Sequence, residues 1–356
     1  MNNHLKYRRM EAESLIFFQF QRNFSYPLSL FETRIRHTRL LIIVRHGRYM
    51  KGIVIKVYGL FYTVNADNRN INCTLRGILR KTLDNKRFSN PVAVGDFVTI
   101  STNADGTGTI DDIDERRNIF SRKEKGRTRK EDIIACNLDR IVVIQSFRQP
   151  KLNLRFVDRL IIRGHKEGIP VILCVNKTDL ANKDDLEYVE QYYKNADINI
   201  MFICALKRKG VMQLKKIISG QTSLLAGYSG AGKTSILNAI YPHLDLRVSE
   251  VSETTGKGRH TTTNVSMVMT DDTTRIIDTP GLREFGLMDI EPHTLETFFP
   301  EFSGYRNHCE YSPCSHDHEP KCEIKKQVEA GKIFKDRYIS YIHMLNSLKE
   351  YYNGMY

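Results

Sequence analysis

The sequence lacks any apolar run long enough to cross a membrane. Its longest candidates, such as residues 40–44, have only the length of a strand, whereas a membrane-spanning helix needs about 20 apolar residues. The N-terminus also lacks the continuous apolar core of a secretory signal. Of the seven cysteines, four are scattered through apolar, strand-like segments and three crowd together near histidines, which is not the pattern of a disulfide framework. We therefore expect a cytoplasmic protein in a reducing compartment, with no membrane partner.

Acidic side chains are in the minority, since 41 Asp and Glu residues stand against 54 Lys and Arg residues and leave a net charge of +13. This balance favours a polyanionic partner, nucleic acid first, over an acidic small substrate. A generally basic enzyme without such a partner fits the charge equally well. The length of 356 residues allows two or three domains, each with its own core.

Residues 1–49 are basic, contain clustered aromatic residues and show no sustained hydrophobic period. Met50 then opens a clean strand pattern. We expect residues 1–49 to be an extension that is disordered or that precedes the true start codon.

The next segment, residues 50–118, has five short β-rich runs broken by turn residues, at 53–57, 61–64, 71–75, 92–100 and 107–110. This pattern predicts a small OB-type barrel, a fold that commonly binds single-stranded nucleic acid. Tyr58, Phe61 and Tyr62 are candidates for base stacking, although we expect at least half of them to pack the barrel instead. The basic stretch at 116–130 indicates a linker that is solvated or touches RNA.

Strands alternate with helices from about residue 139 to residue 287, which predicts a parallel α/β sheet. We expect strands at 141–146, 170–176, 198–204 and 222–226, with helices at 156–166 and 185–195.

A P-loop pattern follows the last of these strands and opens a helix, which is the context that the motif requires. Its glycines let backbone N–H groups surround a phosphate, Lys233 reaches the β and γ oxygens, and Thr234 can bind Mg²⁺. The nucleotide-binding residues that it predicts are Gly227, Tyr228, Ser229, Gly230, Ala231, Gly232, Lys233, Thr234 and Ser235.

A second apolar strand ends at Asp278 in the motif Asp-Thr-Pro-Gly. This places a carboxylate where P-loop enzymes bind magnesium, and it allows the Gly281 amide to sense the γ-phosphate. Between the two motifs, the threonine-rich stretch at 258–263 is a candidate switch, with Thr262 as the expected Mg²⁺ ligand and Thr261 as the alternative.

Two further motifs indicate guanine. Asn176, Lys177, Thr178 and Asp179 form the NKxD pattern, in which the aspartate accepts two hydrogen bonds that adenine cannot donate. After the next strand, Cys204, Ala205 and Leu206 match the loop that lines the base. Alone the first motif fits an ordinary turn, but beside a P-loop the pair favours GTP over ATP.

The guanine motifs precede the P-loop, whereas Ras-like proteins begin with it, so the domain is circularly permuted. In this order the sequence closely resembles the family of ribosome small-subunit-dependent GTPases, from residue 50 to about residue 351. The resemblance implies a multidomain fold: an N-terminal OB-type β-barrel (50–118), a circularly permuted α/β P-loop GTPase domain (119–288) and a C-terminal zinc-binding helical module (289–356).

The C-terminal module contains three thiols and an imidazole within a short stretch, enough for a closed, structural tetrahedral zinc site. His308 and His318 lie close by, but the resemblance places the ligand at His316. The expected ligands are Cys309, Cys314, His316 and Cys322. The following residues, 323–352, are helical in pattern, with basic side chains including Arg337 suited to rRNA contact or to a solvated face.

Leu282 stands where Ras-type enzymes carry a water-orienting glutamine, and an apolar side chain cannot orient water. We therefore expect slow intrinsic hydrolysis, with Lys233, Thr262 and His260 as catalytic residues and His260 orienting the water on the ribosome. The resemblance implies a GTPase in late small-subunit maturation. We expect it to be a monomer. Its expected partners are the subunit with its rRNA, GTP and GDP, and other maturation factors. A non-catalytic, GTP-switched RNA-binding regulator is the alternative.

Overall fold

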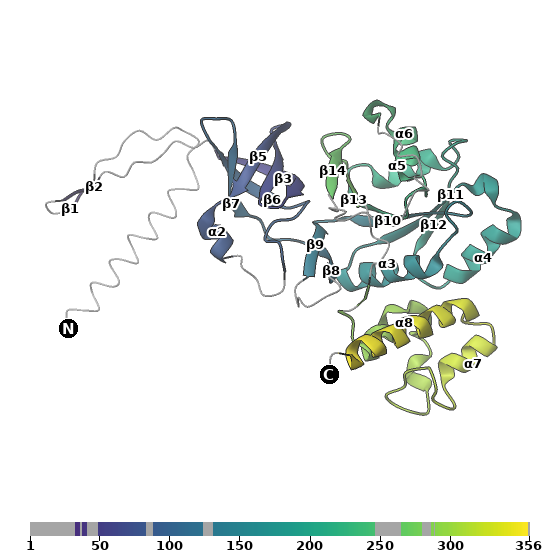
Figure 1. Cartoon of the computed structure of the whole chain (residues 1–356). Helices are drawn as coiled ribbons and strands as arrows, with labels where there is room; N and C mark the ends of the chain where they lie inside the picture. The colour runs from purple at the N-terminus through teal and green to yellow at the C-terminus, as the bar shows by residue number, and fades with distance from the viewer. Residues whose placement is uncertain are drawn as a thin grey trace, which may run out of the picture. The chain divides into compact units, whose positions relative to one another are not determined.

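The computed structural model describes residues 49–82, 88–123, 131–245, 265–279, 286–287 and 289–354, together with the backbone of 33–35 and 38–40 (Figure 1). The chain divides into two units, Met1–Arg48 and Tyr49–Tyr356. In the first unit, β1 (Thr33–Ile35) and β2 (Thr38–Leu40) form an antiparallel pair that the sequence analysis did not predict. Among the described residues, no helix combines the length and the apolar character needed to cross a membrane.

Five strands form a closed barrel at the start of the second unit. They are β3 (Tyr49–Tyr58), β4 (Phe61–Ala66), β5 (Arg69–Leu75), β6 (Phe97–Thr102) and β7 (Gly108–Ile113). β3 pairs with both β4 and β6, and β5 pairs in parallel with β7, so the ring runs β3–β4–β5–β7–β6. Helix α2 (Gly77–Thr82) follows β5. The predicted OB-type barrel is confirmed.

Two details of the barrel differ from the prediction. The expected strand at 92–100 begins only at Phe97, because Gly95 has a φ of 97° and Asp96 accepts a hydrogen bond from the Ala93 amide at 2.8 Å, which together make a buried turn. Of the three candidate stacking residues, Tyr62 is 3% exposed in the barrel core, whereas Tyr58 and Phe61 are 47% and 65% exposed and pair across the β3–β4 turn.

The predicted linker also contains regular structure. β8 (Ile119–Lys123) and β9 (Glu131–Cys136) form an antiparallel hairpin. β8 lies inside the stretch at 116–130 that we interpreted as a linker, either solvated or touching RNA, and β9 begins directly after it. The cause is Phe120, which is fully buried in the main hydrophobic core and fixes β8 there. The sequence analysis missed this strand because the segment is dominated by charged residues and Phe120 was not recognised as a core residue.

The α/β sheet has the predicted parallel strands. In order across the sheet they are β12 (Asn199–Phe202), β11 (Val171–Asn176), β10 (Arg140–Ser146), β13 (Thr222–Ala226) and β15 (Arg275–Asp278). The helices that belong to this sheet are α3 (Leu154–Glu167), α4 (Lys183–Tyr193), α5 (Val211–Ile218) and α6 (Lys233–Ile240), with the 3₁₀ turns η1 (Thr178–Leu180) and η2 (Pro242–Leu244). Separate apolar clusters fill its two faces.

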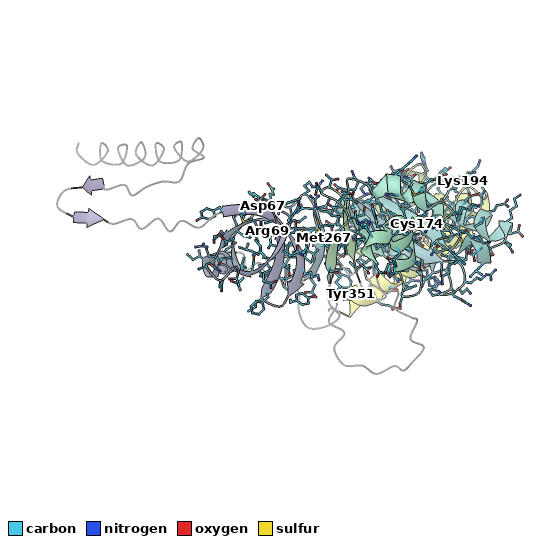
Figure 2. The ribbon with its side chains drawn as sticks, turned by 90° about the horizontal axis from the view of Figure 1, so that it is seen from above. Asp67, Arg69, Cys174, Lys194, Met267 and Tyr351 are labelled. Carbon is cyan, nitrogen blue, oxygen red and sulfur yellow. The ribbon has the colours of Figure 1, made fainter. Side chains whose placement is uncertain are left out.

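A sixth strand joins the sheet to the barrel. β14 (Ser266–Met269) pairs antiparallel with β15, and Ser266 also pairs with Lys56 of β3. Figure 2 shows Met267 of this strand between the barrel residues Asp67 and Arg69 and the sheet residue Cys174. Barrel and sheet are therefore one continuous hydrogen-bonded structure.

The C-terminal module consists of short helical turns and two helices, and it lies beneath α3 in Figure 1. Its elements are η4 (Pro292–Phe298), η5 (Pro300–Phe302), η6 (Arg306–His308), α7 (Glu323–Glu329) and α8 (Lys335–Asn353). The helical pattern that we predicted at 323–352 is thus interrupted, because Gly331 adopts a φ of 69° between the two helices.

A buried ionic network attaches this module to the α/β domain. Asp158 of α3 accepts hydrogen bonds from Arg337 and Ser340 of α8, and from the hydroxyls of Tyr192 and Tyr193 at 2.7 and 2.8 Å. Arg337 also donates to Glu301 at 2.6 Å and is 1% exposed. The expectation that Arg337 contacts rRNA or solvent was therefore wrong, because its charge is neutralised by two buried carboxylates.

Arg337→Met should lower the free energy of unfolding by about 3–5 kcal/mol, since it leaves the buried Asp158 and Glu301 carboxylates without their cation. Urea unfolding at neutral pH measures the change. Lys51→Met is the matched control, because its pair with Asp114 has side chains that are 67% and 41% exposed and should contribute less than about 1 kcal/mol. Equal losses in both variants would contradict the assignment of the network.

Candidate nucleotide site and metal centre

The P-loop lies between β13 and α6, as the sequence predicts, and two of its glycines are required by close contacts. A Cβ atom on Gly227 would lie 2.2 Å from the Ile144 carbonyl oxygen of β10. A Cβ atom on Gly232, which has a φ of 95°, would lie 2.2 Å from Nδ2 of Asn176. Only glycine fits at either position, so the loop is shaped by its neighbours as well as by its own sequence.

The Lys233 ammonium is held by this loop. Its Nζ donates to the carbonyl oxygens of Gly227 at 2.9 Å and of Tyr228 at 3.3 Å. The Ala231 amide closes the turn by donating to the Tyr228 carbonyl at 3.1 Å. A positive charge is thus fixed beside the first turn of α6, where backbone N–H groups and the helix dipole already favour an anion.

Asn176 joins the P-loop to both guanine motifs. Its Nδ2 donates to the Ala231 carbonyl at 3.0 Å, and its Oδ1 accepts from the Ala205 amide at 3.1 Å. Thr178 adds a bond from its hydroxyl to the Ile203 carbonyl at 3.2 Å. The three predicted motifs, which are separate in sequence, therefore meet at one buried amide.

Asp179 lies beside the base loop. Cys204 donates its thiol hydrogen to the Asp179 carboxylate at 3.1 Å, and this hydrogen bond is the main reason that the pKa of Asp179 is lowered. Leu206 of the same loop is 86% exposed. Lys177 has a φ of 59° and donates to the Gln149 carbonyl. An ionised acceptor next to an apolar surface suits a flat heterocycle with N–H donors.

Asp278 is the last residue of β15, which is parallel to its neighbour β13. It therefore lies at the carboxyl-end edge of the sheet, where the P-loop begins. Its Oδ1 is buried and has no hydrogen-bond partner among the described residues. Burial raises the pKa of Asp278, and the charge of Lys233 opposes the rise. An ionised oxygen without a donor fits a bound cation such as Mg²⁺. The expected residues His260, Thr261, Thr262, Gly281 and Leu282 lie outside the described residues.

The four predicted metal ligands come together in the C-terminal module. The ligand atoms of Cys309, Cys314, His316 and Cys322 all lie within 4.8 Å of one another. Nδ1 of His316 is 3.6 Å from the Cys309 sulfur and 3.4 Å from the Cys322 sulfur. Burial raises the pKa of Cys314 to about 12 and that of Cys322 as well, so that a bound cation is needed to hold these thiols as thiolates.

Sequence reasoning missed Glu296, whose carboxylate contacts Nε2 of His316. Such a partner fixes the orientation of the ring, in which Nδ1 faces the Cys309 and Cys322 sulfurs. Glu296 belongs to η4, which precedes the cysteine cluster in the sequence, and no local sequence pattern identifies it as a partner of His316. By contrast His318 is exposed, and its nearest charged partner is Asp317 at 4.0 Å.

Comparison with known proteins assigns the chain to a protein family. A family profile described as "RsgA GTPase" matches residues 113–288, and one described as "RsgA N-terminal domain" matches residues 51–110. A protein of Phocaeicola vulgatus named small ribosomal subunit biogenesis GTPase RsgA is 38% identical over 305 residues, covering 85% of this chain and 98% of that protein. The chain belongs to the RsgA GTPase family. A Flavobacterium johnsoniae protein of the same name is 36% identical over 310 residues, covering 85% and 95% of the two chains.

Solved structures agree with this assignment to the RsgA family. The crystal structure of YjeQ from Thermotoga maritima has a TM-score of 0.66 and 28% identity, covering 84% of this chain and 98% of that one. A structure of YloQ, titled as a circularly permuted GTPase, has a TM-score of 0.62 and 26% identity, covering 89% and 98%. The predicted family and the circularly permuted fold are confirmed.

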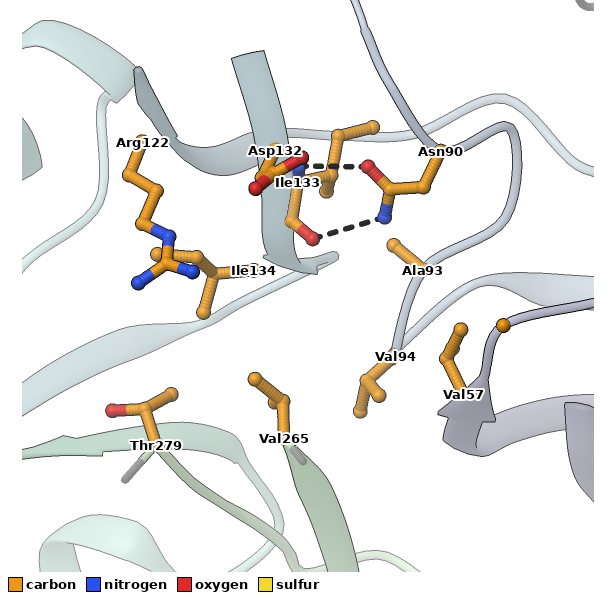
Figure 3. A pocket seen from close by; sticks show the side chains of 11 residues that line it. Val57, Asn90, Ala93, Val94, Arg122, Asp132, Ile133, Ile134, Val265 and Thr279 are labelled. Carbon is orange, nitrogen blue, oxygen red and sulfur yellow. Dashed lines mark hydrogen bonds between the residues drawn. The ribbon is translucent and has the colours of Figure 1, made fainter. Parts of the chain in front are cut away.

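This RsgA-family chain also has a hollow of about 270 Å³ beside Thr279, between the barrel and the β8–β9 hairpin (Figure 3). Its walls are largely apolar and include Val57, Val94 and Val265. The Asn90 side chain on its rim is fully engaged with the backbone of Ile133, at 3.0 and 3.1 Å. Because Arg122 and Asp132 also line the hollow, its lining is mixed in character, and we assign no ligand to it.

Asp278→Asn should raise the melting temperature of the nucleotide-free protein near pH 7 by about 2–4 °C, the shift expected from about 1 kcal/mol. The reason is that burial raises the pKa of Asp278, so its charged form costs stability at neutral pH. As the pH falls through this pKa the wild-type side chain is protonated, and the gain should disappear. Calorimetry over a pH series measures it.

Asp271→Asn is the control of opposite sign. Partial burial acts to raise the pKa of Asp271, but hydrogen bonds from Thr274 and Thr273 outweigh it and lower the pKa to about 2. Its charged form therefore stabilises the fold above the ordinary aspartate range, and that stability is lost as the pH falls towards 2. A loss of stability near pH 7 in both variants would contradict our account of Asp278.

Proposed function

We propose that this protein is a GTP hydrolase that binds the small ribosomal subunit and assists its late maturation. Intrinsic hydrolysis is slow, the subunit stimulates it, and hydrolysis releases maturation factors. The observation that carries the proposal is the convergence of the P-loop and both guanine motifs on Asn176. The buried Oδ1 of Asp278, which has no hydrogen-bond partner among the described residues and lies within the electrostatic reach of Lys233, adds a candidate magnesium ligand. The names of the RsgA relatives indicate the small ribosomal subunit as the partner.

The nucleotide is bound by three groups of residues. Asp179 accepts hydrogen bonds from N1 and N2 of guanine, and the loop of Cys204, Ala205 and Leu206 lines the base. Backbone N–H groups of residues 227–232 and the Lys233 ammonium bind the β and γ phosphates. Thr234, Asp278 and Thr262 would hold Mg²⁺, which neutralises charge on the phosphates when bound. The Gly281 amide senses the γ-phosphate.

His260 orients the attacking water when the protein is bound to the subunit, because Leu282 cannot do so. The subunit and its rRNA bind to the barrel and to the metal-binding module. Tyr58 and Phe61, exposed together on the barrel, are the aromatic candidates for base contact. The protein acts as a cytoplasmic monomer that alternates between GTP and GDP, and it cooperates with other maturation factors.

The metal of the C-terminal module is one structural Zn²⁺ ion. Three sulfurs and one nitrogen supply four donors, the number that a closed tetrahedral zinc site takes, so a bound zinc would have no open position for catalysis. Soft thiolate ligands favour zinc over magnesium or calcium. The Tyr338 and Tyr341 hydroxyls of α8 donate to carbonyls of this segment at 2.7 and 2.9 Å, so the metal also seats the final helix.

GTP turnover by the chain from Met50 should rise at least tenfold when purified small ribosomal subunits are added, with no such rise for ATP. The physical reason is that the catalytic water is oriented only on the subunit. Steady-state phosphate release measures the effect, and large subunits serve as the control. His260→Ala should lose most of the stimulated rate. Tight GTP and subunit binding without stimulated turnover would instead favour a non-catalytic, GTP-switched RNA-binding regulator.

One zinc per chain should be found by metal analysis, and its removal by a chelator should lower the melting temperature of the protein. Cys314→Ser should abolish stoichiometric zinc because it deletes one of four ligands. The exposed neighbour provides the control, since His318→Ala should keep the metal. Loss of zinc in the His318 variant, or full retention in the Cys314 variant, would contradict the ligand set.

A further inference from the structure

The side chain of Tyr228, a P-loop residue, attaches the loop to helix α3. Tyr228 reaches away from the loop to the first turn of α3, where its ring stacks on Phe156 with centroids 4.8 Å apart and planes at 30°. Its hydroxyl accepts a hydrogen bond from Nδ2 of Asn153 at 2.9 Å. The backbone carbonyl of Tyr228 stays in the loop, where Ala231 and Lys233 donate to it. One residue therefore links the Lys233 ammonium to α3.

Asn153 performs two functions at once. It is the N-cap of α3, because its Oδ1 accepts from the Phe156 amide at 3.1 Å. The same amide group then uses Nδ2 for Tyr228. The cap fixes the direction of the side chain, so the donor offered to Tyr228 is already in place when the helix forms.

α3 also carries the contact with the C-terminal module. It is a single helix of 14 residues, and its Asp158 holds Arg337 and Ser340 of α8. A packed helix moves as a rigid element. Any shift of α8 that reaches Asp158 is therefore transmitted to Asn153, Phe156 and the P-loop residue bound to them.

We propose that Tyr228 is a positioning residue for nucleotide binding, which fixes the P-loop carbonyl that holds Lys233 and makes the loop respond to α8 through α3. The proposal rests on the proposed function in one respect, that Lys233 binds the phosphates. It assigns to Tyr228 a role that the P-loop pattern does not contain, because that pattern leaves this position unrestricted.

A double-mutant cycle on GDP affinity tests the clamp in the full chain. Tyr228→Phe removes only the hydroxyl, and Asn153→Ser keeps a good N-cap but is too short to reach Tyr228. Each should weaken Mg²⁺·GDP binding about fivefold, and the double variant should be little weaker than either single one. Fluorescent GDP titration gives the affinities, and calorimetry checks that both variants remain folded.

Tyr241→Phe is the matched control, because the buried Tyr241 hydroxyl has no hydrogen-bond partner among the described residues; its affinity should equal that of the wild type. Unchanged GDP binding in either single variant, or fully additive losses in the double variant, would overturn the clamp. These outcomes do not depend on ribosomal subunits, so they are distinct from a failure of stimulated GTP turnover.

The link to α8 has its own pair of variants. Ser340→Ala deletes a hydrogen bond to Asp158, whereas Ser347→Ala deletes only a bond to the His343 carbonyl on the exposed side of the same helix. GDP affinity should fall about twofold to threefold in the first variant and stay unchanged in the second. Equal affinities in the two would overturn transmission through α3.

Discussion

The nucleotide site depends on one buried amide. Asn176 hydrogen-bonds the P-loop with its nitrogen and the base loop with its oxygen, and it leaves no room for a Cβ atom at position 232. A carboxylate could not donate to Ala231, and a larger side chain at 232 would push the loops apart. The spacing between phosphate-binding and base-binding loops is therefore set by a side chain whose two ends have different hydrogen-bonding character.

The barrel is joined to this site through the backbone. Ser266 pairs with Asp278 on one side and with Lys56 of the barrel on the other, so the candidate magnesium carboxylate is two strands from β3. Neighbouring strands lie about 4.8 Å apart, and in the sheet order β14 is the one strand between β15 and β3. A barrel that carries exposed aromatic residues is thus attached, through β14, to the strand that ends in Asp278.

Where α3 meets the C-terminal module, buried charges accompany the apolar packing of Ile162 against that module. Asp158, Arg337 and Glu301 are neutralised only when α3, α8 and η5 are in register, since a shift would leave a charge buried without a partner. Such an interface specifies one arrangement more sharply than apolar packing does. This network fixes the position of the C-terminal module on the GTPase domain.

The sequence by itself determined the motifs, their permuted order and the barrel, because each follows from local rules such as glycine where the backbone must turn and alternation in strands. Cysteine spacing likewise indicated the three thiols of the cluster, whereas the choice of His316 among three nearby histidines came from the family resemblance. Tertiary structure decided the contacts between segments that are distant in the sequence, which local rules do not specify. The burial of Arg337, the strand at Phe120, the contact of Glu296 with His316 and the clamp on Tyr228 all join residues from separate segments. Their partners lie far along the chain, so only the packed fold shows which charges are neutralised and which side chains meet.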